Sequence, residues 1–280
     1  MTLFHKHVLT SVVSAACALA ATACGGGDSP SVSGPSAETS VTVSFPAGPV
    51  YIGSTTQFEA RETLGNGTTR VPASVSWSSD KVQVAAVSNA GVVSAVAAGE
   101  ATISADVNGT LGSVLVRVLP NFGGAWSGNE TVVSCADSGQ FSGFCSASGF
   151  VGEVFFHESS FTQNMASVTG VLAAGDGTRA TMTGTITVDG DLPLGSAPVL
   201  PADPDIDAQV ENWRSRADTP SRMTGTYEVL FTVPGVSGSA RIGLRLDNVT
   251  KTGASASDVR GRTSGSKLRS RIRSQVRRGD

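Results

Sequence analysis

The chain has 280 residues with 33 glycines, 12 prolines and 6% aromatic residues, and its formal net charge at pH 7 is −3. This composition disfavours long helices and favours short strands joined by tight turns, with thin cores of Val, Ile, Leu and Ala. The weakly acidic balance differs from the strongly basic one of nucleic-acid-binding proteins, so we expect no nucleic acid partner.

The first 23 residues have the pattern of an export signal. A basic residue, Lys6, precedes an apolar run over residues 8–23, which ends at Cys24 before three glycines. The run is shorter than the roughly 20 apolar residues that a membrane-spanning helix needs. A basic start, an apolar core and small residues before a cleavage point are typical of a signal that is removed after export.

The residues around Cys24 give the export signal a more specific interpretation. Ala21-Thr22-Ala23 before Cys24 resembles the lipobox of bacterial lipoproteins, although that family prefers Leu where Ala21 stands. The resemblance implies lipidation at Cys24 and a membrane partner through the lipid, and Gly25 favours the outer membrane of the cell envelope. Residues 24–40 are rich in Gly, Ser, Pro and Ala, so we expect them to form a flexible tether. The alternative is an ordinary secretion signal with an incidental cysteine.

Residues 41–120 are predicted to form a β-sandwich. Apolar and polar residues alternate at residues 41–45, 101–105 and 114–118, and Gly- or Asn-containing turn signals separate these runs at regular intervals. Several short strands at such spacing are typical of sandwich folds.

A set of motifs in this segment resembles the bacterial immunoglobulin-like domain of group 2, over residues of about 40–120. The motifs are Gly53-Ser54-Thr55-Thr56-Gln57-Phe58, Val75-Ser76-Trp77-Ser78-Ser79-Asp80, Val84-Ala85-Ala86-Val87-Ser88, Gly91-Val92-Val93-Ser94-Ala95-Val96 and Ala98-Gly99-Glu100-Ala101-Thr102-Ile103. We expect Trp77 to be the central core side chain, surrounded by Val75, Val87, Val93 and Ile103. Gly91 and Gly99 are expected to supply turn conformations that other residues avoid. The resemblance implies a spacer or adhesive module.

Residues 122–250 are predicted to form a second all-β domain, preferably a small antiparallel β-barrel, with a second β-sandwich as the alternative. The expected strands are residues 131–135, 150–157, 167–172, 180–188, 225–233 and 240–249. Closure into a barrel removes the exposed edges that Gly-rich antiparallel strands otherwise leave.

The start of this domain weakly resembles lipocalin-like barrels. It carries Gly124-Ala125-Trp126, and a late arginine follows in a strand, Arg241 or Arg245. The resemblance implies that this arginine stacks on Trp126 at one barrel end, a cation–π contact. The candidates for contact with a small apolar ligand are Trp126, Phe150, Phe155 and Trp213.

A Pro- and Asp-rich stretch, residues 192–222, is expected to interrupt this domain as a long loop. Val210, Trp213 and Ala217 have the spacing of a short helix with one apolar face. The stretch is either a lid over a barrel mouth or, as we prefer, surface decoration with Trp213 tucked against the domain.

Cys135 and Cys145 are predicted to form a disulfide, since an exported domain folds where disulfides persist. A metal or redox pair is the weaker alternative, because no second ligand cluster accompanies them. Asp203, Asp205 and Asp207 do not continue into an EF-hand pattern. We therefore expect no metal and no cofactor.

The last thirty residues, 251–280, differ sharply in charge from the rest. Residues 24–250 hold ten Lys and Arg against twenty-one Asp and Glu, a net charge of −11, whereas residues 251–280 hold nine against two, a net charge of +7. The preferred interpretation is a disordered basic tail. A gene-model error and a helix that binds an anionic surface are the alternatives.

No catalytic set stands out, and we expect no enzyme. After the export signal the only histidine is His157, and Gly-x-Ser-x-Gly, HExxH and phosphate-binding glycine motifs are all missing. The sequence favours a lipid-anchored envelope protein with a binding or adhesion role towards a surface glycan or protein. The alternatives are a lipocalin-like carrier of a small apolar ligand and a purely structural surface protein.

Overall fold

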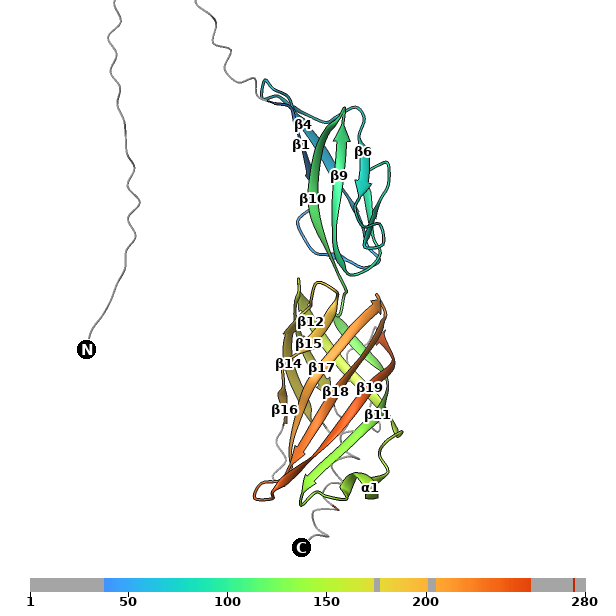
Figure 1. Cartoon of the computed structure of the whole chain (residues 1–280), viewed down its shortest axis with the longest axis vertical. Coiled ribbons are helices and arrows are strands. Elements are labelled where there is room, and N and C mark those ends of the chain that lie inside the picture. Colours follow the sequence, from blue (N-terminus) through green and yellow to red (C-terminus); the bar gives the residue numbers. More distant parts are fainter. Residues whose placement is uncertain (1–37, 174–176, 201–204, 253–273, 275–280) are drawn as a thin grey trace, which may run out of the picture. The chain divides into compact units, whose positions relative to one another are not determined.

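The computed structural model describes residues 38–173, 177–200, 205–252 and 274, which are almost entirely strands and turns (Figure 1). The predicted export signal, Cys24, nearly all of the predicted tether and nearly all of the predicted basic tail lie outside the described residues. Within the described part, no helix has the length and apolar character needed to cross a membrane. The all-β prediction is confirmed.

The N-terminal domain consists of ten strands. They are β1 (Ser40–Ser44), β2 (Val50–Tyr51), β3 (Thr55–Gln57), β4 (Glu59–Thr63), β5 (Thr69–Arg70), β6 (Ser76–Ser79), β7 (Ala85–Val87), β8 (Val92–Ala95), β9 (Gly99–Val107) and β10 (Thr110–Leu119). They form three small sheets in the orders β1-β4-β5, β2-β10-β9-β6 and β3-β8-β7. All pairs are antiparallel except β2 with β10. The alternating burial of β9 places every second side chain in the core between the sheets.

The centre of this core differs from the predicted one. Trp77 is only partly buried and packs against the edge of the core, whereas Phe58, Val93 and Ile103 are at most 1% exposed. Gly91 explains the position of Trp77. Its φ is +78°, and a Cβ there would lie 3.0 Å from Cε2 of Trp77 and 2.9 Å from the Phe58 carbonyl oxygen. The turn therefore needs glycine for its backbone and for the close approach of the indole ring.

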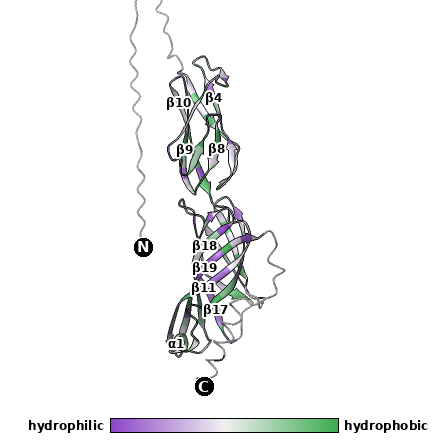
Figure 2. Ribbon diagram, turned by 90° about the vertical axis from the view of Figure 1, so that its right-hand side faces the viewer, coloured by the Kyte–Doolittle hydropathy of each residue, from purple (hydrophilic) through white to green (hydrophobic). Residues whose placement is uncertain are grey.

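The C-terminal domain is a single large antiparallel sheet, here called the C-terminal sheet. Its strands are β11 (Gly124–Gly139), β12 (Val154–Asn164), β13 (Ser167–Ala173), β14 (Arg179–Thr185), β15 (Asp191–Leu194), β16 (Ala197–Leu200), β17 (Asp207–Thr219), β18 (Arg222–Thr232) and β19 (Gly238–Thr252). The order is β13-β12-β11-β19-β18-β17-β15-β14-β16, with further pairings of β13 with β14 and of β16 with β17. Polar and apolar residues alternate along its strands (Figure 2), so one face covers a core that the sheet curls around.

The strands of the sheet are not paired evenly along their lengths. Most neighbours in the strand order share several residue pairs, but β14 contacts β15 by the single pair Gly184↔Leu194. On the other side, β13 pairs with β12 only over Ser159–Asn164. Along the described pairings, the first half of β12 therefore has β11 as its neighbour on one side only. The antiparallel sheet is as predicted, but the preferred closed barrel does not form, because the sheet stays open beside β12; this is consistent with the sandwich alternative.

The predicted loop at residues 192–222 is wrong, because these residues supply β15, β16 and the long strand β17. The predicted helix around Trp213 is also wrong. A β-bulge between Glu211 and Arg214, with Asn212 at φ +53°, shifts the pairing with β18 and changes the phase of the side chains. Val210 and Trp213 therefore both face the core, and their three-residue spacing imitates a helical period. Trp213 is 1% exposed, so it lies inside the sheet.

The disulfide between Cys135 and Cys145 is present, and it closes the connection between β11 and β12. This connection holds the short helix α1 (Phe144–Ser148), whose Phe144 packs against Phe150 with ring centroids 5.6 Å apart. In the chain-entropy model a crosslink over ten residues stabilises the folded state by about 3 kcal/mol. The disulfide therefore fixes this connection on the apolar core at one end of the sheet.

Candidate functional site

The C-terminal sheet contains a small cavity that is partly open to solvent, here called the sheet cavity, with a volume of about 60 Å³. Most of its wall is apolar, and it lies where β12 and β13 separate. The apolar lining residues are Phe156, Leu172, Ala173, Ala180, Val199, Ala208, Val210, Val229, Phe231 and Leu244. The polar ones are Glu130, His157, Glu158, Thr178, Arg179 and Tyr227. An apolar wall with a few polar groups is typical of sites for small ligands.

Three of the polar lining residues form a buried hydrogen-bonded cluster. Glu130 of β11, His157 of β12 and Tyr227 of β18 are each at most 3% exposed. Oε2 of Glu130 accepts a hydrogen bond from the Tyr227 hydroxyl at 2.6 Å and lies 2.9 Å from Nδ1 of His157. Both contacts fall on the same carboxyl oxygen, so Glu130 links the tyrosine ring to the histidine ring. The cluster therefore ties three strands together inside the sheet.

The Tyr227 hydroxyl stays protonated in this environment. Burial raises the pKa of Tyr227 well above its ordinary value, and the nearby Glu130 carboxylate raises the pKa further. The ring is held by stacking on Trp213, with ring centroids 5.0 Å apart. Trp213 in turn donates from Nε1 to the Ser215 hydroxyl at 3.0 Å. Tyr227 is thus a fixed donor to Glu130.

A serine completes the cluster on the other side of the histidine ring. Nε2 of His157 lies 2.9 Å from the Ser159 hydroxyl, so Glu130, His157 and Ser159 form a hydrogen-bonded row. The order resembles that of hydrolytic triads. Ser159, however, is 1% exposed and is not among the residues that line the sheet cavity. The row therefore presents no nucleophile to a molecule in the cavity, and it acts to fix the histidine ring.

The four residues expected to contact a ligand, Trp126, Phe150, Phe155 and Trp213, lie in the core and not in the cavity wall. Each is at most 6% exposed, and none lines the sheet cavity. Their apolar bulk is used for packing, as in the contact of Trp213 with Phe161 at 6.2 Å between ring centroids. Trp213 does not line the cavity, but it stacks on Tyr227, which does.

The cation beside Trp126 is a lysine and not the expected arginine. Nζ of Lys251 lies 5.2 Å from the centroid of the Trp126 ring and donates to the Asn121 carbonyl oxygen at 3.1 Å. Burial lowers the pKa of Lys251. Lys251 belongs to β19, which extends two residues beyond the boundary predicted at residue 250. Arg245 instead pairs with Asp247 at 2.8 Å.

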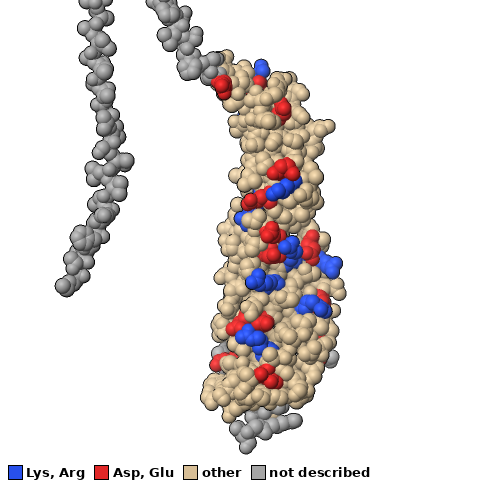
Figure 3. Space-filling model, viewed as in Figure 1, with Lys and Arg blue, Asp and Glu red and all other residues tan. Residues whose placement is uncertain are grey.

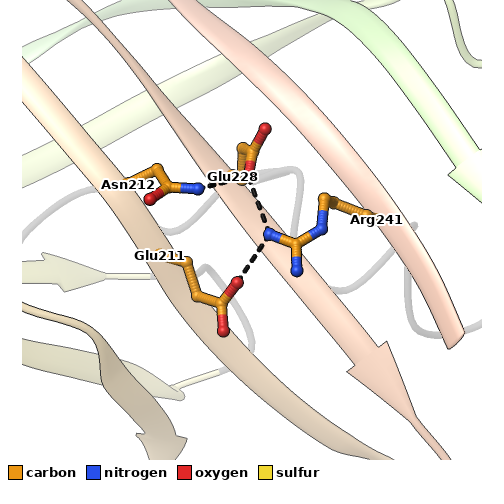
Figure 4. A network of polar contacts seen from close by, with 4 residues as sticks. All are labelled: Glu211, Asn212, Glu228 and Arg241. Carbon is orange, nitrogen blue, oxygen red and sulfur yellow. Dashed lines mark hydrogen bonds and ion pairs between the residues drawn. The ribbon is translucent and has the colours of Figure 1, made fainter.

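Arg241, the other predicted partner of Trp126, belongs to a network on the outer face of the sheet (Figure 4). Its Nη1 donates to Glu211 at 2.6 Å and to Glu228 at 2.8 Å, and Asn212 donates to the same Glu228 oxygen at 2.6 Å. Acidic and basic side chains are interspersed on the face of the molecule shown in Figure 3. The network joins β17, β18 and β19 at the bulge around Asn212, so it stabilises the local register.

We expect the stability of the chain to fall in acid partly through Glu228. The hydrogen bonds from Asn212 and then Arg241 lower its pKa, so its contribution is complete above the ordinary pKa of 4.5 and is lost as the pH falls through the folded-state pKa. The effect is expected to stay below about 1 kcal/mol, as for other partly exposed pairs. Urea unfolding at pH 6 and pH 3 should show a smaller acid loss for Glu228→Gln than for the wild type. Thr226→Ala, an exposed change on the same strand, should retain the wild-type loss; equal losses in all three proteins would contradict the prediction.

Metal binding has no support in the part of the chain that the structure describes. No group of three or more His, Cys, Asp or Glu side chains has the geometry to hold a metal ion there. Asp203 of the tested calcium pattern lies outside the described residues, and Asp207 is an exposed residue at the start of β17.

The sequence singled out His157 but did not reveal its partners. Glu130 and Tyr227 are separated by 97 positions, and neither belongs to a recognisable motif. One feature of the sequence could have indicated the site: a charged residue at a position of a strand whose side chain faces the core. Glu130 is such a residue, because it shares the buried face of β11 with Trp126 and Val132. A buried carboxylate at such a position needs partners and so marks a polar site.

Comparison with known proteins bears on the N-terminal domain. No curated protein matches the chain. One family model matches the N-terminal domain, and domains of that family are typically non-enzymatic and suggest a bacterial surface or adhesion-type protein. Residues 37–116 match the family model of the bacterial Ig-like domain (group 2), which confirms the resemblance for this part of the chain.

Proposed function

We propose that this chain is an exported binding protein whose C-terminal sheet holds a small, largely apolar ligand in the sheet cavity. The observation that supports this function is the cavity itself, with ten apolar residues and a buried polar cluster in its wall. The carrier alternative thereby becomes the preferred one, ahead of adhesion to a glycan or protein. The Ig-like domain acts as a spacer.

The direct test fills the cavity. Ala180 lies in the wall, is 1% exposed and sits on β14, so Ala180→Phe places a ring in the ligand space. The matched control is Thr181→Phe, the next residue on the same strand, which faces outwards. The probe is N-phenyl-1-naphthylamine, a neutral apolar dye that fluoresces in apolar surroundings.

We expect the wild type and Thr181→Phe to bind the dye saturably with similar affinity, and Ala180→Phe to bind it at least about tenfold more weakly. If overpacking prevents Ala180→Phe from folding, as its circular dichroism would show, Val199→Phe in the more exposed part of the wall replaces it. Equal binding by the wild type and a folded cavity variant would overturn the proposal.

We further propose that the chain is anchored by lipid at Cys24 and reaches the cell envelope, with the outer membrane as the favoured site. The support is the apolar run before Cys24 and the small residues beside it, together with a family of surface-type domains. Mass spectrometry of protein extracted from host membranes should find Cys24 as a lipid-bearing N-terminus. An unmodified N-terminus at another residue would overturn the anchoring.

A further inference from the structure

We infer that residues 267–278 of this chain, here called the basic segment, dock as a helix on the open side of the C-terminal sheet beside β12. Such docking goes beyond the proposed function, because it assigns a contact surface and the part of the chain that covers it. Four observations support it: the uncovered edge of β12, the side chains beside that edge, the pattern of the basic segment, and the reach of the chain that leads to it.

The first half of β12 is an edge of the sheet. Residues 154–158 pair with β11 on one side, and the pairing of β12 with β13 begins only at Ser159. An unpaired edge presents backbone N–H and C=O groups to other chains, and folded proteins commonly cover such an edge with a helix or a loop. None of the described strands covers this one. A covering segment is therefore expected from elsewhere in the chain.

The surface beside this edge is apolar and carries carboxyl groups at both ends. Phe156 and Leu172 are half-buried and line the sheet cavity where it opens to solvent. Glu153 precedes the unpaired half of β12 and Glu158 ends it, whereas the nearby basic residue, Arg179, is exposed on β14. The surface therefore suits a partner that combines an apolar stripe with positive charges.

The basic segment has this combination. It holds six Lys and Arg and no Asp or Glu, whereas residues 24–250 have a net charge of −11. Leu268, Ile272 and Val276 are spaced four residues apart, which predicts one apolar stripe along a helix. Ser274 is helical and exposed in the structure. It is two residues from both Ile272 and Val276, about 200° around the helix axis from each, so its exposure fits a stripe that faces the sheet.

The chain can place the basic segment on this edge. Thr252 at the end of β19 and Ser160 of β12 both pair with Ala125, from its two sides. They therefore lie about 10 Å apart, two strand spacings. Residues 253–266 can span up to about 45 Å when extended. A helix over 267–278 is about 18 Å long, close to the roughly 17 Å of the unpaired half of β12.

Hydrogen-exchange mass spectrometry of the full chain, without dye or lipid, tests the docking. Ile272→Asp puts a carboxylate into the apolar stripe. We expect residues 268–276 and the first half of β12 to exchange at least about tenfold faster in this variant than in the wild type, because the burial of one large aliphatic side chain is lost. Ser274→Asp is the matched control: it adds the same charge on the exposed face and should retain the wild-type rates.

A chain that ends at residue 266 provides a second comparison and should show the same faster exchange in β12. Exchange of residues 268–276 at the rate of an unstructured peptide in the wild type would overturn the docking. Equal rates in the wild type and Ile272→Asp, or changes that leave β12 unaffected, would overturn it as well. Protection of residues 268–276 only after addition of vesicles with anionic lipid would instead assign the basic segment to a membrane surface. The proposed function would stand in each of these cases, because its own test is dye binding.

Discussion

Glu130→Ala is expected to lower the free energy of unfolding of the C-terminal sheet by about 1–3 kcal/mol for each buried polar group that is left without its partner. The substitution removes the partner of both the Tyr227 hydroxyl and Nδ1 of His157, and these two side chains are at most 3% exposed. A buried polar group without a partner retains the full cost of leaving water. Urea unfolding at pH 7, with the disulfide intact, measures the change.

Two variants separate this effect from a general sensitivity to substitution. Glu130→Gln keeps an acceptor oxygen for one donor, so its loss should be clearly smaller than that of Glu130→Ala. Asp207→Ala removes an exposed carboxylate at the start of β17 and should stay within about 0.5 kcal/mol of the wild type. A loss for Glu130→Ala no larger than that of Asp207→Ala would contradict the buried cluster.

Trp213→Ala is expected to cost about 3–5 kcal/mol, the range for large aromatic residues in a core. Trp213 is 1% exposed, stacks on Tyr227 with centroids 5.0 Å apart and donates to Ser215. The cavity left by the missing indole also frees the Tyr227 ring, so the dye should bind more weakly. The midpoint of urea unfolding and the dye titration report the two effects.

Val154→Ala is the control for this prediction, because Val154 is 60% exposed at the start of β12. It should leave both the stability and the dye affinity near the wild-type values. A loss below about 1 kcal/mol for Trp213→Ala would contradict its position inside β17.

The parts of the fold that the sequence predicts are those that local chemistry determines. In the Ig-like domain, the tight turn at Gly91 requires a positive φ and a close backbone approach. Only glycine meets both requirements easily, so this residue in the sequence predicts the turn. The alternation around Ile103 likewise places one face of β9 in the core. The size of Trp77 predicts a place at the centre of the core, but a residue that packs over a turn is shielded on one side only.

The failures in the C-terminal sheet have a different origin. The bulge at Asn212 adds one residue to the period of β17, so a strand there resembles a helix or a loop when only spacing is considered. The polar cluster depends on strand register, which brings β11, β12 and β18 together, and register over such long separations is set by the whole sheet. Sequence patterns therefore indicate the class of the domain, whereas the site emerges only from its three-dimensional pairing.

Energy transfer from tryptophan to bound N-phenyl-1-naphthylamine tests the central claim most directly, because it locates the ligand. Trp213 stacks on Tyr227, and Tyr227 lines the sheet cavity. The chain has three tryptophans, so the test uses the double variant Trp77→Phe/Trp126→Phe, in which Trp213 is the one remaining donor. The account predicts strong transfer in this protein. Saturable dye binding without transfer in the folded double variant would place the dye away from the sheet cavity and would contradict the proposed binding site.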